Sequence, residues 1–157
     1  YGLTINLGYK NFDLNIKGTG VGGNEKLYAL NRGDFPQQNT LLEFYENMWT
    51  PTNTTNAKYA KPDYTDTYYR ASSHMIFDAS FFKVKQIQLG YSIPKAILQK
   101  AKVSELRAYV SLEDWFTFTK YPGLDPETSS NTTASLAIDQ ANYPIAKKFS
   151  FGVNVTF

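Results

Sequence analysis

The last eleven residues, KKFSFGVNVTF (147–157), alternate apolar and polar side chains up to the end of the chain. This period of two predicts a β-strand with one apolar and one polar face. Chain ends usually fray unless a neighbouring element holds them, so we expect this strand to be paired. The apolar positions are Phe149, Phe151, Val153, Val155 and Phe157, and the polar positions are Ser150, Gly152, Asn154 and Thr156.

The same alternation recurs in four earlier segments. Residues 3–9 and 12–16 predict a hairpin with a very short turn. In residues 80–93 the phase breaks near Lys85, where a β-bulge would return Phe82 and Ile87 to one face. Residues 105–119 alternate throughout, although Asp114 interrupts the apolar face. The chain therefore predicts an all-β fold of about five antiparallel strands.

The connections between these strands alternate in length. They are short at 10–11, long at 22–79, short at 94–104 and long at 120–142. Since antiparallel neighbours place successive connections at opposite ends of a sheet, all long connections fall at one end. Transmembrane β-barrels have this asymmetry, with strands of about 9–11 residues and aromatic girdles at both interfaces. We expect the girdles to contain Tyr9 and Tyr91 at the short-turn end, and Trp115, Phe116, Phe118, Tyr121 and Tyr143 at the other.

Composition and motifs exclude several kinds of site. The net charge of +2 gives no basic surface for nucleic acid, and the chain contains no cysteine. Residues 18–23 (GTGVGG) match a dinucleotide fingerprint but lack the helix and parallel strand that such a site needs. Glu113 and Asp114 are sequence neighbours, so their side chains point to opposite faces of a strand. With His74 as the only histidine, we predict no catalytic, cofactor or metal site, and no enzymatic activity.

Aromatic residues crowd the first long connection. Their faces suit stacking on sugars or peptides, and loops often hold binding residues. We favour a second interpretation, that they pack the loop against itself or against a partner protein, because a long loop also needs a small core of its own. The candidate contacts for ligand or partner are Tyr45, Trp49, Tyr59, Tyr64, Tyr68 and Tyr69.

Five stretches resemble one known family in the same order along the chain. The segment 80–94 (SFFKVKQIQLGYSIP), together with 106–127 and 143–157, is similar to the C-terminal end of SusC/RagA-like TonB-dependent outer-membrane transporters. Residues 8–23 and 48–62 resemble the preceding hairpin and a Trp-Thr-Pro segment of that family. Asp114-Trp115 departs from the usual Asn-Leu of the family, and Tyr59–Pro62 departs from Pro-Arg.

The resemblance implies that residues 1–157 form the C-terminal part of a transmembrane barrel of about 22 strands with an internal plug. The loops at 22–79 and 120–142 would be extracellular. The parent protein would lie in the bacterial outer membrane, in contact with lipid, and import glycans or peptides. It would work with a SusD-like surface lipoprotein, and with TonB through N-terminal regions absent from this chain. Phe157 would be the signal that the barrel-assembly machinery reads.

Two alternatives remain open from the residues alone. A small, complete eight-stranded outer-membrane barrel would need three further strands within residues 22–79. A secreted β-sandwich that binds carbohydrate would account for the aromatic residues but not for the asymmetric connections.

Overall fold

A computed structural model describes residues 1–29, 41–61, 72–99, 103–128 and 137–157 of the chain. The chain divides into two compact units. The first, here called the sheet unit, comprises Tyr1–Gly22, Phe81–Thr119 and Ile145–Phe157. The second, the loop unit, comprises Gly23–Ser80 and Lys120–Pro144. Each unit therefore combines segments that lie far apart in the sequence.

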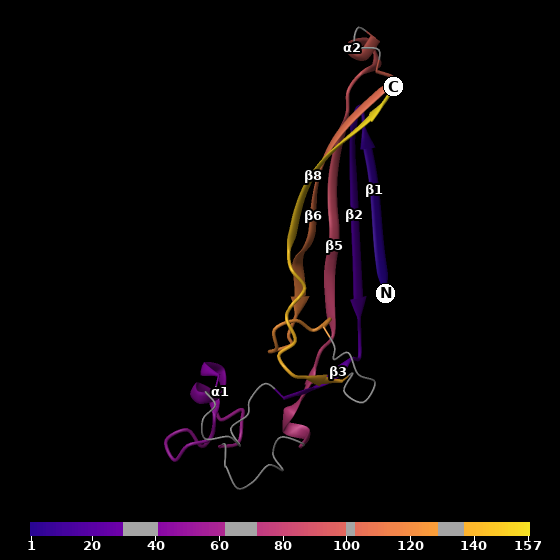
Figure 1. The fold of residues 1–157 in the computed structure, drawn as a ribbon. Helices are drawn as coiled ribbons and strands as arrows, with labels where there is room; N and C mark the ends of the chain where they lie inside the picture. The colour runs from indigo at the N-terminus through magenta and orange to yellow at the C-terminus, as the bar shows by residue number, and fades with distance from the viewer. Residues whose placement is uncertain (30–40, 62–71, 100–102, 129–136) are drawn as a thin grey trace. The chain divides into compact units, whose positions relative to one another are not determined.

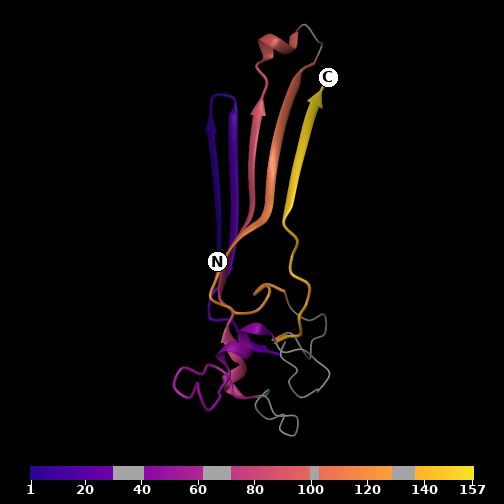
Figure 2. The same cartoon turned by 90° about the vertical axis from the view of Figure 1, so that its left-hand side faces the viewer.

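The sheet unit is one antiparallel sheet of five strands in the order β1-β2-β5-β6-β8 (Figures 1 and 2). Its strands are β1 (Gly2–Tyr9), β2 (Phe12–Val21), β5 (Phe81–Ser92), β6 (Glu105–Thr119) and β8 (Lys148–Thr156). β1 and β8 are its edge strands. The predicted number, direction and approximate bounds of the strands are confirmed, and the long strands reach 12 and 15 residues.

The predicted bulge in β5 is present at Lys85. Lys17 pairs with Gln86, but the next residue of β2, Gly18, pairs with Val84, so Lys85 has no partner on β2. A second bulge on β6 faces it, since Gln86 pairs with Glu113 while Val84 pairs with Phe116. The bulge at Lys85 keeps the apolar side chains of β5 on one face despite the change of phase in its sequence.

Asp114 lies in this second bulge, which the sequence did not indicate. Its φ of 57° places it in the left-handed region, where short polar side chains are tolerated better than most. Its Oδ1 is 3.1 Å from Nζ of Lys85, the bulged residue of the neighbouring strand. Asp114 is therefore an ion-paired bulge residue, where the sequence had indicated a regular strand.

The two faces of the sheet differ in polarity. On one face, Asn15 donates a hydrogen bond to Asn6, and Gln86 donates to Ser111 at 3.4 Å. Arg107 forms an ion pair with Asp13 on the same face. The other face presents apolar side chains that are exposed in this unit, among them Leu3, Leu7, Leu89, Val110, Phe149, Phe151, Val153 and Val155.

Aromatic side chains gather near both ends of the apolar face. At one end Phe82 stacks with Tyr1 and with Phe118, at centroid distances of 6.2 and 6.5 Å. At the other end, Phe12 and Tyr91 are in contact with centroids 4.6 Å apart. Tyr121, expected in the first of these groups, is instead buried in the core of the loop unit.

The short connections lie at one end of the sheet, together with the C-terminus (Figures 1 and 2). Lys10 and Asn11 form the two-residue turn between β1 and β2, and Lys10 has a φ of 52°. Between β5 and β6 lies the short helix α2 (Lys95–Leu98). Phe157 follows β8 and its side chain is 88% exposed. No helix among the described residues has the length and apolar character needed to cross a membrane.

The loop unit contains a small sheet in the order β4-β3-β7. Its strands are β3 (Glu25–Tyr28), β4 (Ile76–Asp78) and β7 (Ile138–Asp139), accompanied by α1 (Leu42–Asn47) and the 3₁₀ helix η2 (Ser73–Met75). Strands of two to four residues are too short to cross a membrane. The described residues thus do not supply the additional strands that a complete eight-stranded barrel requires. The glycine-rich segment 18–23 leads from β2 into β3 rather than into a helix.

Candidate functional site

The loop unit has a core made largely of aromatic rings. Phe44 of α1 stacks on Tyr59 with centroids 4.0 Å apart, and on Tyr28 at 5.5 Å. The rings of Tyr28 and Tyr121 make an edge-to-face contact, with their centroids 6.1 Å apart. Since Tyr121 follows β6 whereas the other three rings precede β5, both long connections contribute to one core. Met75 and Ala79 are buried in the same cluster.

A buried polar cluster accompanies this core. The hydroxyl of Tyr121 donates a hydrogen bond of 2.6 Å to Oδ2 of Asp139. Burial, together with this hydrogen bond, raises the pKa of Tyr121. Lys26 is buried, donates to the carbonyl of Thr128, and has its pKa lowered by burial, against the opposing charges of Asp139 and Asp125. Each buried charge thus has a polar partner, as buried charges require.

The predicted aromatic contacts fall into three groups. Tyr45 and Trp49 are 65% and 44% exposed, so their rings are accessible in the loop unit. Tyr59 is 5% exposed, and its hydroxyl donates a 3.3 Å hydrogen bond to Glu43. Burial, with the nearby charge of Glu43, raises the pKa of Tyr59 to about 12. Tyr64, Tyr68 and Tyr69 lie outside the described residues.

An open groove of about 410 Å³ lies beside Trp49 in the loop unit. Its wall is built by backbone pairing, because the amide of Trp49 donates to the carbonyl of Tyr59 at 2.8 Å. The amide of Lys58 donates in turn to the carbonyl of Asn47, also at 2.8 Å. The groove is lined by Trp49, Thr54, Ala57, Lys58, Tyr59, Ala60, Lys61 and His74.

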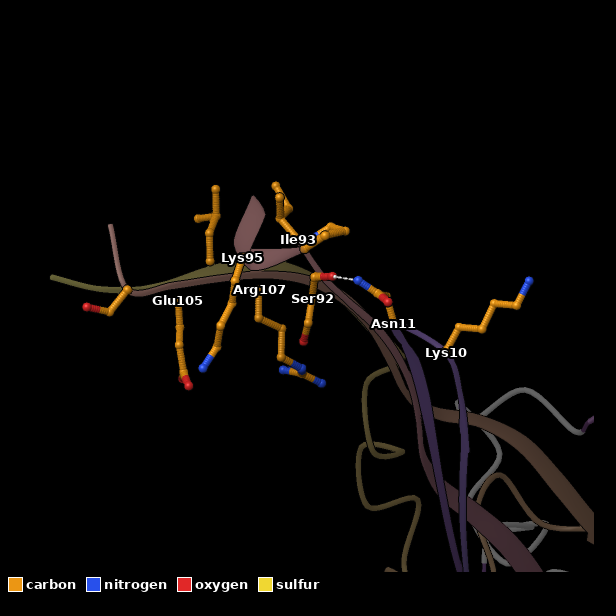
Figure 3. A pocket seen from close by; sticks show the side chains of 10 residues that line it. Lys10, Asn11, Ser92, Ile93, Lys95, Glu105 and Arg107 are labelled. Carbon is orange, nitrogen blue, oxygen red and sulfur yellow. Dashed lines mark hydrogen bonds between the residues drawn. The ribbon is translucent and has the colours of Figure 1, made fainter. Parts of the chain in front are cut away.

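A second cavity, of about 480 Å³, lies in the sheet unit beside the short connections. Figure 3 shows Lys95, Glu105 and Arg107 extending on one side of the sheet, with Ile93 on the other. Asn11 donates a 2.8 Å hydrogen bond to the carbonyl of Ser92 at its rim. Arg107 is already paired with Asp13, so the cavity presents Lys95 and Glu105 as its further charged groups on that side.

Trp49 and Tyr59 were predicted from the sequence as candidate contacts, but the charged residues around them were not. Lys58 and Lys61 flank Tyr59 in the segment AKYAK, and His74 comes from a distant part of the same connection. His74 is exposed and lines the groove. Its position beside Trp49 depends on the folding of the whole connection, for which no local pattern gives a signal.

The chain is similar to proteins of one kind over nearly its whole length. It is 32% identical to the TonB-dependent receptor P3 of Formosa agariphila over 99% of the chain. It is 29% identical to the TonB-dependent receptor SusC of Bacteroides thetaiotaomicron, also over 99%. The chain spans only 16% and 15% of the lengths of these two relatives. No protein-family model matches the chain.

The fold of the chain is also similar to that of solved structures of such proteins. The structure of the RagAB peptide transporter matches 99% of the chain with a TM-score of 0.77 at 22% identity, and the chain covers 17% of the matched chain. The RagAB peptide importer in its open-open state matches with a TM-score of 0.72. The five-stranded sheet therefore has the fold of a fragment of a larger β-barrel.

Proposed function

We propose, from the premise that this chain belongs to the SusC/RagA-like family of TonB-dependent receptors, that it forms part of an outer-membrane nutrient transporter. The observation that carries this proposal is the five-stranded antiparallel sheet, which has exposed apolar side chains on one face and polar side chains on the other. A sheet that crosses a membrane must present apolar residues to lipid and must close on itself to satisfy its edges. The open edges of β1 and β8 would then pair with strands of the rest of the barrel.

In this proposal the chain is the C-terminal segment of the barrel wall. Phe149, Phe151, Val153 and Val155 face lipid, whereas Ser111 and Arg107 face the lumen. Phe157, exposed just after β8, is the signal recognised by the barrel-assembly machinery. TonB would act through regions of the protein outside this chain.

The loop unit supplies part of the extracellular mouth. Tyr45 and Trp49 are its accessible aromatic contacts for a ligand or for a SusD-like surface lipoprotein. Tyr59 acts from the core by holding the wall of the groove, and Tyr64, Tyr68 and Tyr69 remain further candidates from the sequence. The imported nutrient is a glycan or a peptide.

The test is made on the full-length protein that carries this chain. A short epitope inserted between Thr54 and Thr55, both exposed in the loop unit, is expected to be labelled by antibody on intact cells. The same epitope inserted between Lys10 and Asn11 is the matched control, and is expected to be labelled only after the cells are permeabilised. Folded barrels also change gel mobility on heating, and this shift is expected in the outer-membrane fraction. Recovery of the protein only in the soluble fraction would refute the proposal.

A further inference from the structure

We propose that the groove beside Trp49 binds a negatively charged sugar residue of the imported oligosaccharide. This inference rests on the proposed function and adds the chemical class of the ligand. It concerns a groove formed wholly within the loop unit, from residues 49–61 and His74.

The aromatic wall of the groove is held in place before any ligand binds. The amide of Trp49 is bonded to the carbonyl of Tyr59, and the side-chain amide of Asn53 donates to the carbonyl of Met48 at 3.3 Å. The ring of Tyr59 is in turn stacked on Phe44 in the core. The indole of Trp49, 44% exposed, is thus an accessible aromatic surface on a rigid support. Preorganised surfaces of this kind lose little conformational entropy on binding.

The polar lining of the groove is basic. Lys58, Lys61 and His74 all line it, and none of its described lining residues is Asp or Glu. Nζ of Lys58 lies 3.7 Å from Oε1 of Glu43, but the side chain of Lys58 is 64% exposed and that of Glu43 is 48% exposed. Exposed ion pairs contribute only about 0–1 kcal/mol, so a ligand carboxylate or sulfate can compete for Lys58. Charge-assisted hydrogen bonds from such donors are stronger than neutral ones.

The remaining lining favours a sugar over a peptide. Beyond the two aromatic residues, the groove offers the methyl groups of Ala57 and Ala60 and the hydroxyl of Thr54. These small groups form no deep apolar pocket of the kind that selects a peptide side chain. An accessible indole, by contrast, provides a flat surface for a sugar ring. An acidic sugar would place its ring on Trp49 and its charged group near Lys58 and Lys61.

The experiment measures binding to the purified full-length protein by titration calorimetry. The probes are oligogalacturonate and heparin-derived oligosaccharides, neutral galacto-oligosaccharides, and a tetraglutamate peptide. We expect an acidic oligosaccharide to bind, its neutral counterpart to bind at least about tenfold more weakly, and the affinity to fall as salt is raised. The tetraglutamate peptide is expected not to bind the protein.

The variants assign the binding to the groove. The double substitution Lys58→Gln with Lys61→Gln is expected to weaken binding by about tenfold or more, through loss of two charge-assisted contacts. Trp49→Ala is expected to weaken it at low and at high salt alike. Lys95→Gln, which removes an exposed lysine from the sheet unit, is the matched control and should leave the affinity unchanged. Limited proteolysis checks that the loop unit of each variant remains folded.

Three outcomes would overturn the inference: no acidic oligosaccharide binds, the tetraglutamate peptide binds in its place, or the lysine variants bind as tightly as the parent. A failure of this kind can be told apart from failure of the proposed function. Surface labelling of the Thr54–Thr55 epitope and heat-dependent gel mobility do not depend on the ligand. If they hold while binding fails, the transporter assignment stands and the acidic-sugar site does not.

Discussion

Asp13 on β2 and Arg107 on β6 form a bidentate ion pair across the strand that separates them. Nε of Arg107 lies 2.9 Å from Oδ1 of Asp13, and Nη2 lies 2.5 Å from Oδ2. The strand between them is β5, where Gly90 pairs with Asp13 on one side and with Tyr109 on the other. A Cβ atom on Gly90 would lie 2.3 Å from Nη2 of Arg107. The pair therefore depends on the missing side chain of Gly90, which leaves space for the two charged groups to meet.

Substitution Gly90→Val is expected to break this ion pair and to destabilise the folded protein by about 1–3 kcal/mol. Gly8→Val is the matched control, since Gly8 lies on β1 opposite Asp13 and nothing lies within 4 Å of its Cβ position. The measurement is the temperature at which the detergent-solubilised protein loses its folded gel mobility. If this temperature fell equally in both variants, the result would show that the space beside Gly90 is unimportant for stability.

Phe44→Ala is expected to loosen the loop unit while the sheet unit stays intact. Phe44 is 1% exposed and stacks on two tyrosines, and such substitutions typically cost about 3–5 kcal/mol. Limited proteolysis should therefore cut the loop unit faster, with little change in heat-dependent gel mobility. Tyr45→Ala, on the same helix but exposed, should leave the cleavage rate unchanged. An identical rate for both variants would contradict the shared core.

The loop unit is expected to lose stability in alkali, beginning near pH 10. Burial raises the pKa values of Tyr28 and Tyr59 from 10.0 to about 12. The unfolded chain therefore releases these protons at lower pH than the folded chain, so stability is full below pH 10 and falls as the pH rises toward 12. Tyr59→Phe, which has no phenol to ionise at this position, should make the decline less steep. The measurement is proteolytic susceptibility of the loop unit against pH, with tyrosinate absorbance recorded in parallel.

Deletion of Phe157, or Phe157→Ala, is expected to reduce insertion into the outer membrane and to leave ligand binding by the inserted fraction unchanged. Phe157 is exposed just after β8, and in the proposed function it is the signal recognised by the barrel-assembly machinery. Tyr143→Ala, which removes another exposed aromatic ring, is the control. Quantitative surface labelling measures the effect, and normal surface levels of both Phe157 variants would remove the signal role.

Local periodicity was enough to predict the sheet, because each long strand shows its two faces in its own residues. It also located the bulge at Lys85, since a bulge shifts the phase of the alternation. The opposing bulge at Asp114 was not predicted. A regular strand with one polar residue on its apolar face would have the same sequence pattern, so the pattern does not reveal this bulge. The packing of Tyr59 into a small aromatic core of the first long connection was among the interpretations of the sequence, but the participation of the second long connection in this core was not predicted. Its contacts join residues such as Tyr28 and Tyr121 that lie far apart in the chain, and no local pattern records such a pairing.

The loop unit also limits how this protein can be re-engineered or can diverge. The backbone of Leu27 donates to the carbonyl of Ala137 at 2.8 Å, and β3 pairs with β7, so the two long connections are joined by hydrogen bonds as well as by aromatic packing. A chimera that receives only one connection from a relative would contain a core whose two halves come from different proteins, and their side chains would not pack well against each other. The two connections therefore have to be exchanged as one unit, and new specificity is expected to arise when both are replaced together.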